Sequence, residues 1–121
     1  MAVNGLEIFD HTEAGYARKA EYDAWVVALC NPAERFTEAG RTYIERHMET
    51  DEVFVLLEGS AYLTIGLEMT KVELEPNKIY NVKRGVWHSH VMSPDAKVLI
   101  VENSNTSAAN SEKLPLSELK K

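Results

Sequence analysis

The sequence predicts an all-β protein built as a sandwich or barrel. Short runs rich in β-branched and aromatic residues follow one another at intervals of about 8–12 residues. Glycine, proline and asparagine separate these runs, as they do at the turns between strands. Helical periodicity is weak along the whole chain. Together these observations favour many short strands over a helical or mixed fold.

The first four predicted strands lie in the N-terminal half of the chain. An apolar run stops at the turn signal Asn31-Pro32, and an alternating run follows Gly40. Two β-branched and aromatic runs come next with only a short break between them, so we expect these two to form a β-hairpin. The four runs cover residues 22–29, 41–48, 53–57 and 61–65.

Four further strands are predicted in the C-terminal half. Glu75-Pro76-Asn77, Arg84-Gly85 and Ser93-Pro94-Asp95 are the turn signals that separate them. They cover residues 71–74, 79–82, 86–92 and 97–101.

The two ends of the chain carry weaker signals. Residues 13–20 are compatible with one or two helical turns, which Gly15 weakens. Residues 103–110 are rich in Asn, Ser, Thr and Ala and are typical of a mobile connector. We therefore expect a single domain over residues 1–121, with a barrel core at about 22–101. The remaining tail, residues 102–121, is expected either to fray or to dock on the barrel or on a neighbouring subunit.

Composition limits the classes of partner. The chain has 121 residues, enough for one domain, and 13 basic against 19 acidic residues give a net charge of −6. This balance argues against nucleic acid or an anionic membrane as the main partner, although a small anionic ligand needs only local positive charge. The single cysteine, Cys30, cannot form an intrachain disulfide and is expected to be a small buried apolar residue. The first residues lack the layout of a secretory signal, so a cytoplasmic location is expected.

Histidines and carboxylates recur at strand spacing. Residues two apart in a strand point to the same face, so Glu45 shares a face with His47, and His88 shares a face with His90. Glu52 follows a polar tetrad that could return the chain beside the first of these strands. In a closed barrel both faces can point inward. Imidazole and carboxylate are the usual ligands of Zn, Mn, Fe and Ni.

Periodicity alone leaves a second interpretation open. The other face of the 41–48 run carries Ile44 and Met48. If that face were the buried one, Glu45 and His47 would lie in solvent.

Two stretches resemble the motifs of the cupin superfamily. Residues 40–59 match a pattern of Gly, His-x-His, Glu and Gly, with His47, Glu52 and Gly59 in register and Glu45 in place of the first histidine. Four residues separate Gly40 from Glu45, one fewer than the motif has between its glycine and its first histidine. Residues 85–88, Gly-Val-Trp-His, resemble the second motif, although Lys83 and Met92 stand where Pro and Asn are usual.

This resemblance implies a double-stranded β-helix, the cupin or jelly-roll barrel, that holds a divalent metal ion (Zn, Mn, Fe or Ni). His47, Glu52 and His88 are then the expected ligands, with Glu45 as a fourth ligand. It also implies a homodimer and a small-molecule ligand. An enzyme of this class would act on a small polar or anionic metabolite by lyase- or isomerase-type chemistry. Candidate proton-transfer residues are His90 and Glu45.

Substrate contacts are predicted at Tyr43, Arg46 and Arg84. A guanidinium group binds a carboxylate bidentately, which makes the two arginines candidate anion clamps. The alternative is that both lie exposed at the barrel rim. Arg46 in particular has the opposite strand parity to Glu45 and His47.

In a narrower similarity, residues 45–47, 53–55 and 80–88 resemble ureidoglycolate lyase, a cupin that releases urea from ureidoglycolate to give glyoxylate. Other functions compatible with the same fold stay open. They are a non-catalytic module that binds or senses a small ligand, a sugar isomerase or epimerase, and a dioxygenase.

Overall fold

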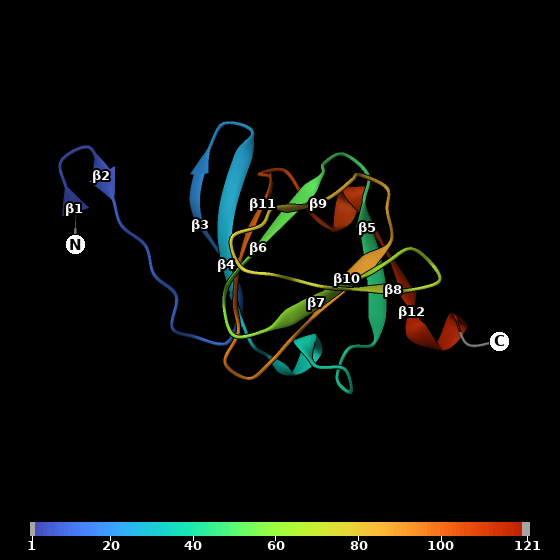
Figure 1. Cartoon of the computed structure of the whole chain (residues 1–121). Helices are drawn as coiled ribbons and strands as arrows, with labels where there is room; N and C mark the ends of the chain where they lie inside the picture. The colour runs from blue at the N-terminus through green and yellow to red at the C-terminus, as the bar shows by residue number, and fades with distance from the viewer. Residues whose placement is uncertain (1, 120–121) are drawn as a thin grey trace.

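The computed structural model describes residues 2–119 and consists of two facing five-stranded antiparallel sheets (Figure 1). In spatial order, the first sheet contains β12 (Ser111–Pro115), β5 (Tyr43–His47), β10 (His88–Met92), β7 (Ala61–Ile65) and β8 (Thr70–Glu73). The second contains β3 (Gly15–Tyr22), β4 (Trp25–Asn31), β11 (Lys97–Asn103), β6 (Glu52–Glu58) and β9 (Tyr80–Val82). Three short 3₁₀ helices complete the fold: η1 (Glu34–Phe36), η2 (Ala108–Asn110) and η3 (Leu116–Glu118). The all-β prediction is confirmed.

From β5 onward the chain passes repeatedly from one sheet to the other. The predicted hairpin between residues 53–57 and 61–65 is therefore wrong. β6 pairs with β11 and β9, whereas β7 pairs with β10 and β8 in the opposite sheet. The turn between β6 and β7 is a corner between sheets, and Gly59 occupies it with φ +68°, where an added Cβ would lie 2.6 Å from the Cα of Ala96. Glycine is required there because the backbones of the two connections meet.

Residues 13–20 do not form helical turns, contrary to the sequence prediction. They contribute most of β3, which pairs antiparallel with β4 from Gly15↔Asn31 to Tyr22↔Trp25. Asp23 makes the turn with φ +51°. The local preference for helix is small, and the ladder of hydrogen bonds to an apolar neighbouring strand outweighs it. Tyr22 accordingly ends β3, and the predicted strand at 22–29 begins at Trp25.

The C-terminal tail docks on the barrel of the same chain. β12 extends the first sheet by pairing with β5, from Ser111↔His47 to Pro115↔Tyr43. The connector before it contains η2, which Ser107 and Asn110 cap reciprocally. The two sheets thus use residues 15–115, a longer stretch than the predicted core of about 22–101.

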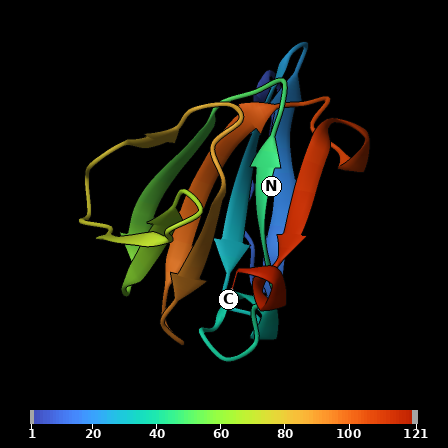
Figure 2. The same ribbon diagram turned by 90° about the vertical axis from the view of Figure 1, so that its right-hand side faces the viewer.

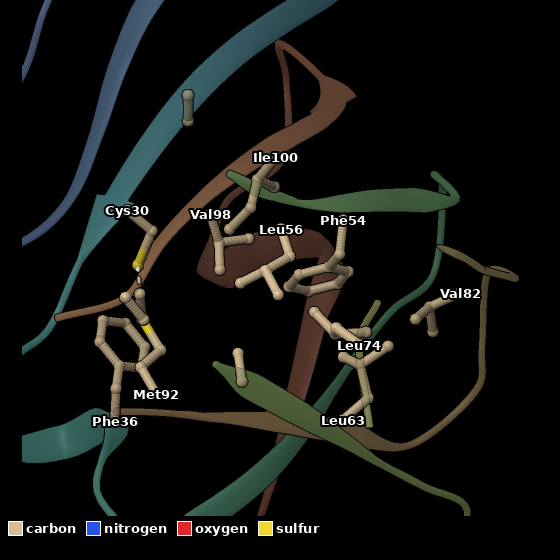
Figure 3. Close-up of a cluster of buried hydrophobic side chains, with 13 residues drawn as sticks. Cys30, Phe36, Phe54, Leu56, Leu63, Leu74, Val82, Met92, Val98 and Ile100 are labelled. Atoms are coloured by element: carbon tan, nitrogen blue, oxygen red, sulfur yellow. Dashed lines mark hydrogen bonds between the residues drawn. The ribbon is translucent and has the colours of Figure 1, made fainter. Parts of the chain in front are cut away.

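Figure 2 shows the sandwich turned by 90°, and Figure 3 shows the side chains of the core, which lies between the two sheets. Alternate residues of β6 and β11 face alternate residues of β7 and β10 across it. Burying each large apolar side chain contributes about 1.5–3 kcal/mol. The largest members are Phe54, Leu56, Leu63, Leu74, Val82, Met92, Val98 and Ile100. Cys30 is fully buried beside them, as predicted, and burial raises the pKa of its thiol to about 12.

A small hairpin precedes the sandwich and stands apart from it (Figure 1). It consists of β1 (Ala2–Val3) and β2 (Leu6–Glu7), and the apolar residues from Val3 to Phe9 are exposed. Over residues 2–119, no helix is long and apolar enough to cross a membrane.

Candidate functional site

A cavity of about 170 Å³ lies between the sheets, and the core residues Phe36, Phe54 and Ile100 form part of its lining. Strands β5 and β10 of one sheet and β6 and β11 of the other supply most of its walls. Most of the lining residues carry polar or ionisable groups, so candidate chemical groups are concentrated here. These residues are Tyr16, Arg35, Arg41, Thr42, Tyr43, Glu45, His47, Glu52, His88, Ser89, His90 and Glu102.

Strand β5 has both of its faces covered. Tyr43, Glu45 and His47 line the cavity, and Ile44 on the opposite face is fully buried. The interpretation that would leave Glu45 and His47 in solvent because Ile44 is buried is therefore wrong. Periodicity could not decide between the faces because each carries a buried residue, Ile44 on one and His47 on the other.

Glu52 joins the two motif histidines at the centre of the site. Its Oε1 lies 2.8 Å from Nε2 of His88 and 3.1 Å from Nε2 of His47. All three residues are buried. Because β6 belongs to one sheet and β5 and β10 to the other, the sandwich itself brings these groups together.

The outer nitrogen of each imidazole is also held. Nδ1 of His88 donates a hydrogen bond to the carbonyl oxygen of Val86 at 3.0 Å. Nδ1 of His47 lies 2.8 Å from Oγ of Ser111, which β12 contributes. Both rings are thereby oriented with Nε2 toward Glu52, the arrangement that fixes the tautomer of a metal-ligating histidine.

The charges of the cluster reinforce one another. Burial disfavours the Glu52 carboxylate, but the hydrogen bonds and positive charge of the two histidines prevail, so its pKa is lowered. Burial likewise disfavours imidazolium at His47 and His88. The hydrogen bond and charge of Glu52 outweigh that effect and raise the pKa of both. The cluster therefore stabilises a positive charge beside Glu52.

These residues fit a divalent metal ion. Ligand atoms sit about 2.0–2.2 Å from such an ion, so two ligands at a right angle lie about 3 Å apart. The separations of 2.8 and 3.1 Å between Glu52 and the two Nε2 atoms match that value. Glu45 adds a carboxylate oxygen 4.0 Å from Nε2 of His47, and one ligand atom each from Glu45, His47 and His88 fall within 4.8 Å of one another.

His90 occupies the inner part of the cavity beside the core. Its ring stacks on Phe36 with centroids 4.4 Å apart, and its Nε2 lies 3.6 Å from Sγ of Cys30. Burial lowers the pKa of His90 to about 4. Burial thus favours its neutral form, and its ring makes none of the hydrogen bonds to Glu52.

The arginines lie differently from the sequence prediction. Arg46 stacks on Trp87 at 4.5 Å outside the cavity and donates two hydrogen bonds to Glu112. Arg84 is exposed, and neither residue lines the cavity. Arg35 and Arg41 do line it. Position 41 shares the parity of 43, 45 and 47, so continuing that alternation by one step would have indicated Arg41.

Two other residues of the site were missed. Tyr16 lies in β3, a region predicted to be helical, and no sequence signal placed it near the histidines. Glu102 lies in β11 with the inward parity of Val98 and Ile100. The predicted strand ended at residue 101, one position too early to include it.

Neither a protein-family model nor a curated protein sequence matches this chain. Solved structures do match. A cupin-2 domain containing protein from Shewanella frigidimarina superposes with a TM-score of 0.60 at 20% identity, over 76% of this chain and 84% of its own. KdgF from Halomonas sp. superposes with a TM-score of 0.58 at 18% identity, over 84% and 91%.

A third structural match is Streptomyces Pac13, described as a unique nucleoside dehydratase. It superposes with a TM-score of 0.63 at 8% identity, over 90% of this chain and 92% of its own, and a variant of it was solved with uridine. At identities this low the likeness establishes the fold. The double-stranded β-helix that the two sequence motifs predicted is confirmed, and the chain has the cupin fold.

Proposed function

We propose that this protein is a metal-dependent enzyme that acts on a small carboxylate-bearing metabolite in the cavity between the two sheets. The observation that carries the proposal is the convergence of His47, His88 and Glu52 in a buried site. Oε1 of Glu52 lies 2.8 Å from Nε2 of His88 and 3.1 Å from Nε2 of His47. A cationic side chain, Arg41, lines the same cavity.

His47, His88 and Glu52 would hold the metal, with Glu45 as the fourth ligand. Two imidazoles and two carboxylates suit Mn(II) and Fe(II), and are also compatible with Zn(II) or Ni(II). A bound divalent ion supplies Lewis-acid polarisation of a substrate oxygen. Ser111 and the carbonyl of Val86 would keep the imidazoles oriented toward it.

Arg41 is the group we assign to the substrate carboxylate. Its Nη1 donates to Oγ of Ser89 at 3.0 Å, and its buried Nε has no hydrogen-bond partner among residues 2–119. A buried donor without a partner is costly, and a bound carboxylate would satisfy it. Ser89 is in turn fixed by Oγ of Thr64 at 2.5 Å. Arg41 is thus held against β10, the strand that carries His88.

Proton transfer falls to Glu45 or His90, both of which line the cavity. The Glu45 side chain is 34% exposed, so a ligand entering the cavity reaches it directly. His90 faces the same space from the inner wall. Glu45→Gln and His90→Gln are assayed separately, each with its metal content measured, because Glu45 is also assigned to the metal. The variant that lacks the proton acceptor loses kcat while it keeps both the metal and the KM for the carboxylate substrate.

Metal analysis tests the proposal directly. Protein purified without chelator is expected to carry a first-row divalent ion near one equivalent, and the double variant His47→Ala/His88→Ala is expected to lose it. His11→Ala is the matched control, because His11 is buried outside the cavity and bonds the carbonyl oxygen of Gly15. Equal metal content in wild type and double variant would refute the metal site.

Ureidoglycolate is the first substrate to assay, because it carries a carboxylate and because residues 45–47 and 80–88 resemble its lyase. Release of urea and glyoxylate with Mn²⁺, Fe²⁺, Zn²⁺ or Ni²⁺ supplied would establish the lyase reaction. Ligand binding without turnover of this compound or of a panel of hydroxy and keto acids would instead favour a binding or sensing module. Pac13 is an example of an elimination enzyme on this fold, and it adds nucleosides to the panel.

A further inference from the structure

Glu102 brings a carboxylate to the cavity from outside both sequence motifs. Glu102 lies in β11, in the sheet that also carries Glu52, and is only 8% exposed. Tyr16 in β3 donates a hydrogen bond from its hydroxyl to Oε2 of Glu102 at 2.7 Å. That contact holds one of the two carboxylate oxygens.

The second oxygen, Oε1, is buried and has no hydrogen-bond partner among the residues that the structure describes. Natural proteins rarely leave a buried carboxylate oxygen unsatisfied. One carboxylate oxygen of Glu102, one of Glu52 and one nitrogen of His47 lie within 4.8 Å of one another. The neighbours of Glu102 are therefore two of the groups already assigned to the metal.

We propose that Glu102 is a further metal ligand, contributed by β11 and held in place by Tyr16. This inference rests on the proposed function, since it adds a ligand to the same site. Glu102 then joins Glu52 and His47 in a set of two carboxylates and one imidazole, which shares His47 with the set of Glu45, His47 and His88. Carboxylate-rich sites favour harder ions, so Glu102 shifts the preference of the site toward Mn²⁺ relative to Zn²⁺.

Titration calorimetry of the metal-stripped full chain with Mn²⁺ and separately with Zn²⁺ tests this assignment. Glu102→Gln keeps the size of the side chain and removes the anionic ligand. We expect it to weaken Mn²⁺ binding at least tenfold, since even partners that only orient a ligand are worth about 10–100-fold in affinity. Zn²⁺ binding should fall less, so that the ratio of the two affinities changes. The EPR spectrum of bound Mn²⁺ should change with the ligand set.

Glu58→Gln is the matched control. Glu58 ends β6, the strand of Glu52, and is exposed, so the variant removes the same charge without touching the cavity. Tyr16→Phe leaves the carboxylate in place but frees Oε2, and should weaken Mn²⁺ binding less than Glu102→Gln does. If Glu102→Gln fails to fold, Mn²⁺ binding is measured on Glu102→Asp instead. This variant keeps the negative charge, but its side chain is one methylene shorter, so the carboxylate lies farther from the metal site.

Unchanged Mn²⁺ affinity and EPR spectrum in Glu102→Gln, or in Glu102→Asp where that variant decides, would overturn the role of Glu102 while leaving the proposed function intact. Failure of the wild-type protein to bind any divalent ion would instead overturn the proposed function and this inference with it.

Discussion

Nε2 of His88 lies 2.8 Å from Oε1 of Glu52, although the two residues belong to different sheets and are separated by 36 positions in the chain. His47 completes the contact at 3.1 Å from the same oxygen. The site therefore forms only where the two sheets face each other. The experiments below separate what each residue does for stability from what it does for binding.

Glu52→Gln should destabilise the metal-stripped protein and abolish its metal binding. A buried carboxylate that accepts two hydrogen bonds from histidines is replaced by a neutral amide, which we expect to lower the free energy of unfolding by about 1–3 kcal/mol. The pKa of His47 and of His88 should fall, because the charge of Glu52 raises both. Urea unfolding and NMR titration of the two imidazoles measure these effects.

Glu45→Gln is the companion variant. Its side chain is partly exposed and lies 4.0 Å from His47, so the change in unfolding free energy should stay below about 1 kcal/mol. Equal losses of stability in the two variants would contradict the central position assigned to Glu52.

Arg41→Met should raise KM for a carboxylate substrate tenfold or more, whereas Arg46→Met should leave KM unchanged. Arg41 lines the cavity with an unpaired Nε among the described residues, and Arg46 lies outside it against Trp87 and Glu112. A lost bidentate contact to a carboxylate removes substrate binding, while a lost surface pair costs at most about 1 kcal/mol of stability. Steady-state kinetics on both variants, with calorimetry of substrate binding, would show the contrast. An unchanged KM in Arg41→Met together with a raised KM in Arg46→Met would assign the carboxylate contact to Arg46, as the sequence predicted.

Ser111→Ala should weaken metal binding roughly tenfold with little change in unfolding free energy. Its hydroxyl lies 2.8 Å from Nδ1 of His47, the position from which a neighbour orients a ligating imidazole. Competition with a chelating dye measures the affinity. Ser117→Ala, an exposed serine in η3, is the control. An unchanged affinity in Ser111→Ala would mean that β12 does not support the site.

Cys30 should react with thiol reagents only after unfolding. Burial raises its pKa from 9.0 to about 12, so the folded protein at pH 8 holds almost no thiolate, and the reagent has no path to the sulfur. Because the folded pKa is the higher one, this group stabilises the fold fully below about pH 9 and loses that contribution as the pH rises toward 12. Iodoacetamide labelling followed by mass spectrometry, with and without 8 M urea as a denaturant (about the usual concentration for full unfolding), tests this. Rapid labelling of the native protein would contradict the burial.

The sequence predicts most of the strands and the gathering of His47, Glu52 and His88 in one cavity, because both follow from short-range patterns. Alternation over residues 43–47 places Tyr43, Glu45 and His47 on one face, and the cupin motifs select that face as the inner one. The same patterns do not reveal which sheet a strand joins. β6 and β7 look like a hairpin because only a short turn divides them, whereas their pairing is decided by β9, β10 and β11.

Two of the missed residues, Tyr16 and Glu102, share a physical cause, because they reach the site from strands whose extent depends on pairing with distant neighbours. Arg41 differs, since the alternation of positions 41, 43, 45 and 47 indicates it. Conversely, Arg46 looks like a clamp because it lies between two site residues. Its strand parity places it on the outer face with Trp87.

Crystals of the protein grown with Mn²⁺ and measured at the manganese absorption edge would show whether His47, His88 and Glu52 bind a divalent ion. We expect an anomalous peak about 2.0–2.3 Å from Nε2 of His47, Nε2 of His88 and an oxygen of Glu52. A well-ordered cavity without that peak, with the two histidines still bonded to Glu52, would contradict it.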